Sequence, residues 1–192
     1  MSKLEEPVSI HEMRRRAPLH YWAKAQNARF AAYAINTMDQ EAQKRCAEQL
    51  GYLGALHEAF FREAALALEL IIKAVIAQRI EVRLAQRHVV KVRPTHDLVS
   101  LWSDAELPRL PPDDLHRLMI AKRILHWAGR YAAPRTDEQA DREQEEMAPL
   151  EERPISSRLK ARRLRSFGWD DFDRIYQVAL TSFVELSGNL PA

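Results

Sequence analysis

The chain has 192 residues, a formal net charge of +2 at neutral pH and a single cysteine, Cys46. This length allows one domain with a sizeable core, and so small a net charge does not by itself indicate a nucleic-acid-binding protein. We expect a cytoplasmic protein without a membrane span, because a lone thiol cannot form an internal disulfide, no secretory signal is visible, and Glu69 and Lys73 interrupt the longest apolar stretch.

Scarce glycine and abundant Ala, Leu, Arg and Glu favour helix, so the composition predicts an all-α fold. Residues 1–19 are polar and contain Pro7 and Pro18, which indicates a flexible or loosely docked N-terminal arm. From about His20 to Leu50, apolar residues recur at spacings of three and four, which predicts a first long helix.

A second helix is expected from about Leu53 to Arg87. Its apolar residues form two adjacent stripes, which together leave almost no polar surface between Ala64 and Ala77. A helix that is apolar nearly all round lies in the middle of a bundle or at a dimer interface. The sequence therefore predicts that this helix is enclosed by others.

Two shorter helices are expected next. Thr95 is predicted to be the N-cap of the first, which runs through Trp102. The second is expected from about Asp114 to Ala128, with Asp113 as its N-cap after a pair of prolines.

The rest of the chain divides by charge. Residues 136–168 are expected to form a charged linker, acidic at first and basic over residues 158–165. The basic cluster is interpreted either as a phosphate-binding strip or as neutralising the acidic stretch before it. Residues 169–192 are expected to form a C-terminal amphipathic helix that docks on the bundle.

Three strings occur in an order that resembles the HEPN domain family. They are ALALELIIKAVIAQR at residues 65–79, THDLVSLW at 95–102 and WAGRYAAPR at 127–135. The resemblance covers about residues 20–135 and implies an antiparallel up-and-down bundle of four to five helices, to which the C-terminal helix is appended. It also implies a homodimer that associates with a nucleotidyltransferase, an antitoxin or a defence system, and that binds nucleotide or RNA.

Four candidate ligand-binding residues lie on the second helix and before the third. Glu69 and Lys73 have the spacing of a helical ion pair, and they either form a structural pair, bonded to His96 or Arg130 across the bundle, or help to line a ligand cleft. His96 and Asp97 precede a helix, where they either bind an anion or order the loop as a cap.

Three further candidates lie around the end of the helix that precedes Gly129. Arg130 offers a guanidinium to phosphate and Tyr131 a stacking face to a base, or else they cap the helix and pack in the core. His126 lies four residues before Arg130, and this pair is the candidate catalytic pair for cleavage of RNA.

Active HEPN ribonucleases often carry Arg, four to six intervening residues and then His. Arg83 with His88, and Arg109 with His116, match this spacing, but neither lies in the helix where the family would place its active site. No metal-ligand spacing and no glycine-rich phosphate loop is visible, so we expect neither a metal nor a cofactor.

Three functional hypotheses follow. The first is a HEPN-like dimer that binds nucleotide or RNA, as a partner of a nucleotidyltransferase or a component of a toxin–antitoxin or defence system. The second is a non-enzymatic protein-interaction module, in which the bundle dimerises and the charged C-terminal region recruits a partner. The third is a metal-independent endoribonuclease that acts through an Arg and a His of each protomer.

Overall fold

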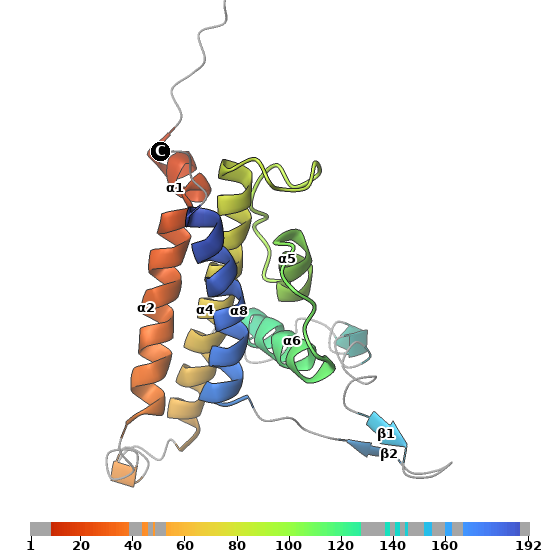
Figure 1. Cartoon of the computed structure of the whole chain (residues 1–192). Coiled ribbons are helices and arrows are strands. Elements are labelled where there is room, and N and C mark those ends of the chain that lie inside the picture. Colours follow the sequence, from red (N-terminus) through yellow and green to blue (C-terminus); the bar gives the residue numbers. More distant parts are fainter. Residues whose placement is uncertain are drawn as a thin grey trace, which may run out of the picture.

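The computed structural model shows a helical protein with one short hairpin (Figure 1). It describes residues 9–38, 44, 45, 48, 53–127, 137, 138, 141, 142, 145, 152–154, 160–162 and 167–188. The helices are α1 (Ile10–Arg16), α2 (Pro18–Asn36), α4 (Leu53–Glu81), α5 (Leu98–Asp104), α6 (Pro112–Trp127) and α8 (Trp169–Gly188). Two three-residue strands, β1 (Glu152–Pro154) and β2 (Lys160–Arg162), pair antiparallel within the segment expected to be a linker.

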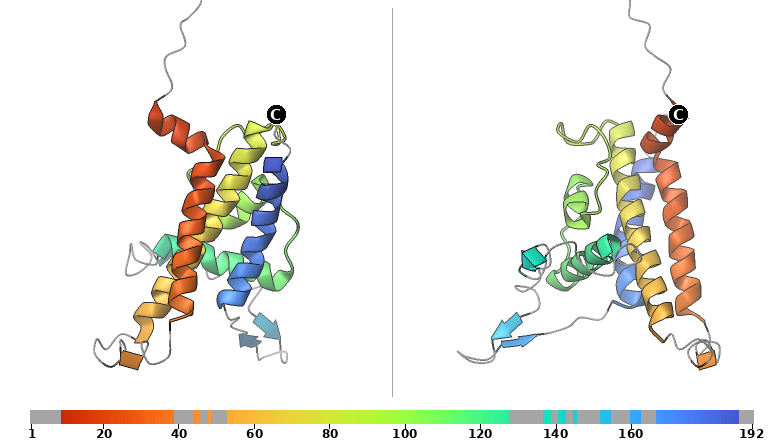
Figure 2. Two further views of the ribbon diagram at one scale, coloured as in Figure 1. Left: turned by 60° about the vertical axis from the view of Figure 1, so that its left-hand side comes forward. Right: turned by 180° about the vertical axis from the view of Figure 1, so that it is seen from behind.

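Helix α4 is the centre of the bundle, which confirms the expectation of an enclosed helix. Every residue from Ile71 to Gln78 is buried. Helices α2, α5, α6 and α8 all pack against it. Figure 2 shows α2 antiparallel to α4, α8 running in the same direction as α4, and α6 lying across them.

Helix α2 meets α4 through small side chains. Apart from Pro18 at its start, its buried residues are Ala25, Ala28 and Ala32. The buried residues of α4 also include several alanines, among them the fully buried Ala64. Alanines on both helices let the two backbones approach closely, because little side-chain volume separates them.

The ends of α2 differ from the expected ones. The helix begins at Pro18, where a proline at the first helical position has no N–H to leave unsatisfied. It ends at Asn36, so the expected extension to Leu50 is wrong. The Thr37 hydroxyl donates a hydrogen bond of 2.9 Å to the Tyr33 carbonyl, and a local bond of this kind competes with continuation of the helix.

Helix α4 ends at Glu81, six residues before the expected Arg87. Arg83 has a φ of 60°, in the left-handed region that side chains other than glycine rarely adopt. The backbone N–H groups of Leu84 and Ala85 both donate to the Arg79 carbonyl, at 2.8 and 3.1 Å. These bonds give the Arg79 carbonyl at the end of the helix its hydrogen-bond donors, and they turn the chain into the loop before α5.

The expected N-caps of α5 and α6 are both shifted. Asp97 caps α5 by accepting from the Ser100 N–H at 3.4 Å, whereas the Thr95 hydroxyl accepts from the Asp97 N–H at 3.1 Å. Thr and Asp are both favoured as N-caps, and in this loop the N-cap of α5 is Asp97. Helix α6 begins at Pro112, so Asp113 lies in its first turn.

Helix α8 is part of the core. Phe172, Ile175, Tyr176 and Ala179 are fully buried, largely against α4.

None of the helices in the described segments has the length and hydropathy that crossing a membrane would require.

An ionic cluster joins α6 to the start of α8. The buried Asp114 carboxylate accepts from Arg174 at 2.6 and 3.1 Å and from Arg117 at 2.9 Å. The hydrogen bonds from Arg174 are the largest cause that holds the pKa of Asp114 below its ordinary value. The ionised form is therefore favoured in the folded protein.

We expect Asp114→Asn to lower the free energy of unfolding by about 1.5–3 kcal/mol at pH 7, because it removes a charged hydrogen-bond acceptor. The lowered pKa means that the contribution of Asp114 is present above its ordinary pKa of 3.8 and is lost as the pH falls through the folded value. Urea denaturation at pH 7 and pH 3 should show a smaller acid loss in Asp114→Asn than in the wild type. Asp170→Asn, at an exposed position of α8, is the control, and equal acid losses in all three proteins would contradict the assignment.

Candidate functional site

Five of the predicted site residues lie together where α4, the loop before α5 and α6 meet. Helix α4 supplies two of them, the loop supplies two adjacent ones, and the last turn of α6 supplies the fifth. We call this group, with Lys122 of α6, the Glu69 cluster; its predicted members are Glu69, Lys73, His96, Asp97 and His126.

The Glu69 carboxylate is the hub of the cluster. Its side chain is only 6% exposed, and it accepts from Lys73 Nζ at 2.5 Å and from His96 Nδ1 at 2.8 Å. The predicted helical ion pair and its bond to His96 are therefore confirmed. Since a buried charge is costly unless it is paired, Lys73 and Glu69 depend on each other.

The bond to Glu69 also sets the tautomer of His96. An ionised carboxylate only accepts hydrogen bonds, so the hydrogen lies on Nδ1 of His96. In the neutral ring, Nε2 is then an acceptor. The side chain is 35% exposed, and within the described residues Nε2 has no hydrogen-bond partner.

His126 lies beside His96, with the two ring centroids 5.9 Å apart and the rings nearly perpendicular. The sequence did not pair these two residues, because they are thirty positions apart and belong to different elements. Two imidazoles at this separation can contact neighbouring groups of one ligand. The catalytic role predicted for His126 stays a prediction.

Asp97 is first of all a cap. Its carboxylate accepts from the Ser100 N–H, as the structural interpretation of this residue expected, and Lys122 Nζ lies 3.7 Å from the same oxygen. Lys122 was missed in the sequence. It lies four residues before His126 on α6, so the spacing of one helical turn was the signal that could have found it.

The other predicted residues either lie outside the described segments or are placed elsewhere in the described structure. Arg130, Tyr131 and the side chains of the basic cluster at 158–165 lie outside the described residues. Arg109 and His116 match the ribonuclease spacing, but His116 is fully buried in α6, so this match offers no exposed imidazole. Arg83 and His88 are exposed in the turns that follow α4, away from the helix core.

The Glu69 cluster combines two ammonium groups, two carboxylates and two imidazoles. Within the described parts of the chain, no three or more Asp, Glu, His or Cys side chains are placed to hold a metal ion. Each ammonium already lies beside a carboxylate, so an anion would share these donors with Glu69 or Asp97, while His96 offers an acceptor to a hydroxyl. A ligand with a phosphate and a nearby hydroxyl therefore suits its chemistry.

Comparison with protein-family models, with curated proteins and with solved structures finds no match to this chain.

Proposed function

We propose that the chain is a HEPN-like protein that binds a nucleotide, free or within RNA, at the Glu69 cluster. Two independent observations support the proposal. The three family-like strings occur in order along the chain, and the first and second of them supply the side chains of α4 and the following loop that converge in the cluster. A nucleotide carries both the anion and the hydroxyl that the cluster would recognise.

The observation that carries the proposal is the orientation of His96. Glu69, neutralised by Lys73, holds Nδ1, and Nε2, at a partly exposed position, has no partner among the residues that the structure describes. Because the side chain is partly exposed, a ligand hydroxyl can take the place of water as the donor to Nε2. Here one nitrogen is kept ready to accept a hydrogen bond, and the ribose hydroxyl of a nucleotide is a suitable donor.

We expect His96→Asn, which keeps a donor near the Nδ1 position and removes Nε2, to weaken the binding of AMP by about tenfold, because one hydrogen bond in a polar site contributes about 1.5 kcal/mol to affinity. Isothermal titration calorimetry would measure this change. The melting temperature should change little, because the Asn amide can still donate to Glu69 from the position of Nδ1. His88→Asn, at an exposed position outside the cluster, is the matched control and should bind AMP as the wild type does.

Unaltered AMP affinity in His96→Asn, or no AMP binding by the wild type, would contradict the proposal. Degradation of RNA by the wild type in the presence of EDTA, abolished in His126→Ala, would favour the endoribonuclease alternative. The proximity of the two imidazoles is the feature on which that alternative depends.

A further inference from the structure

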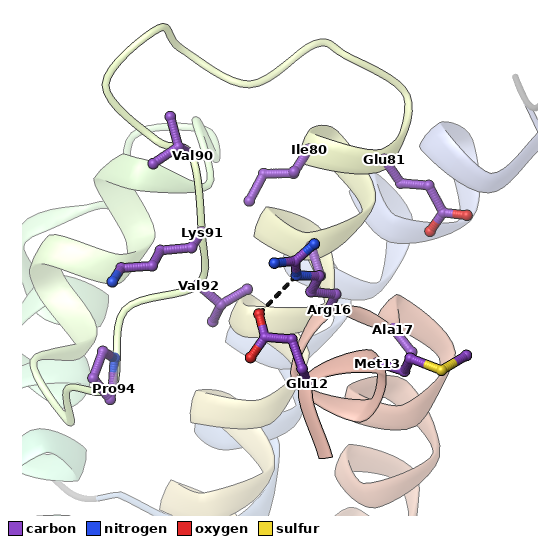
Figure 3. Close-up of a pocket in the computed structure, with 11 residues that line it drawn as sticks. Glu12, Met13, Arg16, Ala17, Ile80, Glu81, Val90, Lys91, Val92 and Pro94 are labelled. Carbon is purple, nitrogen blue, oxygen red and sulfur yellow. Dashed lines mark hydrogen bonds and ion pairs between the residues drawn. The ribbon is translucent and has the colours of Figure 1, made fainter. Parts of the chain in front are cut away.

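A large cavity lies at one end of the bundle, between α1, the last turns of α4 and the loop that follows (Figure 3). Its volume is about 970 Å³, at the upper end of the range for small-molecule sites. The surface is mainly apolar, and charged side chains stand around it. The apolar lining is Met13, Ala17, Ala77, Ile80, Val90, Val92 and Pro94, and the charged residues are Glu12, Arg16, Glu81 and Lys91.

Two residues that line the cavity are close along the chain to members of the Glu69 cluster. Ala77, which lines the cavity, follows Lys73 by one turn on α4, a rise of about 6 Å. Pro94, which also lines it, precedes His96 by two residues. A ligand of nucleotide length that contacts His96 can therefore extend into the cavity.

Arg16 gives the cavity a feature suited to an aromatic ring. Its Nε donates to Glu12 Oε1 at 2.8 Å, which orients the guanidinium. Figure 3 shows this guanidinium projecting toward Ile80 and Val92 across the cavity. A planar guanidinium stacks on aromatic faces, and the apolar lining can take the rest of a ring's surface out of water.

We propose that this cavity binds the base of a mononucleotide whose ribose and phosphate contact the Glu69 cluster, and that Arg16 stacks on the base. The inference rests on the proposed function and adds the ligand class and a second contact surface to it. The volume accommodates a purine, and the polar groups of the base can meet Lys91 or Glu81 at the rim. For neither of these two side chains do the described residues provide a hydrogen-bond or ion-pair partner.

The first test compares AMP with ribose 5-phosphate, which lacks the base, by isothermal titration calorimetry on the full chain. The wild type is expected to bind AMP at least tenfold more tightly than ribose 5-phosphate. Arg16→Ala should weaken AMP binding by about tenfold, a value typical of one lost stacking contact, and leave ribose 5-phosphate unchanged. Arg14→Ala, an exposed arginine of the same helix that does not line the cavity, is the matched control and should change neither affinity.

A second pair of variants tests the cavity itself. Val90→Trp places a bulky side chain at its lip, and Val184→Trp places the same side chain at a similarly exposed position of α8. Only Val90→Trp should reduce the preference for AMP over ribose 5-phosphate. Because both valines are exposed, folding should be preserved in both variants.

The two proposals fail differently in these experiments. Equal affinities for AMP and ribose 5-phosphate, equal effects of Arg16→Ala and Arg14→Ala, or equal effects of Val90→Trp and Val184→Trp would overturn the base-binding cavity. Such results would leave the Glu69 cluster as a phosphate and ribose site if His96→Asn still weakens the binding of both ligands. No binding of AMP at all would overturn both proposals.

Discussion

Replacing Glu69 by leucine is expected to lower the free energy of unfolding by about 3–5 kcal/mol, because the substitution leaves the Lys73 ammonium uncompensated in the core. Both side chains are at least 90% buried, and Glu69 is the only partner of Lys73 among the described residues. The same change also removes the acceptor for His96 Nδ1. Urea denaturation at pH 7, followed by circular dichroism, would measure the loss.

The double variant Glu69→Leu with Lys73→Leu distinguishes a broken pair from lost packing. Two apolar side chains in place of a buried pair often restore stability, so the double variant should be more stable than Glu69→Leu alone. Glu48→Leu, which breaks the exposed pair of Lys44 and Glu48, is the control and should cost less than about 0.5 kcal/mol. If the double variant were as unstable as the sum of the losses in Glu69→Leu and Lys73→Leu, the broken ion pair would not be the cause of the destabilisation.

Phe172→Ala is expected to destabilise the protein by about 3–5 kcal/mol, because it removes a fully buried aromatic ring from the core. The ring centroid lies 5.4 Å from that of Trp169 and 5.7 Å from that of Tyr176, so the substitution also disrupts a row of aromatic contacts on α8. Thermal and urea denaturation would both report the effect.

Val184→Ala is the control for Phe172→Ala, because Val184 is on the same helix but 58% exposed. It should change the stability by less than about 0.5 kcal/mol. If the two substitutions had equal effects, α8 would be an appendage on the bundle and not part of its core. A larger effect of Phe172→Ala would instead show that the bundle requires residues beyond 135.

The burial of α4 could be predicted because it depends on composition around the whole helix, which is readable from the chain alone. The ends of helices were less predictable, because they depend on local hydrogen bonds that compete with each other. Thr37 ends α2, and Asp97 takes the capping position expected for Thr95, through bonds that only the folded loop makes. The sequence contains the right residue types but not the geometry that selects among them.

The candidate site shows the same division. Glu69 and Lys73 were predictable as a pair because one helix fixes their separation, and His96 was noted as a partner for them. The cavity was not predictable, because its lining comes from α1, the end of α4 and the loop after it. Only tertiary packing brings these segments together, and no spacing along the chain encodes it.

The seam between α2 and α4 has a consequence for how the chain can change. On α2 the buried side chains of this seam are those of Ala25, Ala28 and Ala32, apart from Pro18 at the start of the helix. Each is a single methyl group, so little side-chain volume separates the two backbones. An added methyl or methylene there would have to push the two helices apart along their shared length. Amino-acid substitutions should therefore be tolerated least at the smallest buried side chains of this protein, because any increase in side-chain volume there separates the helices.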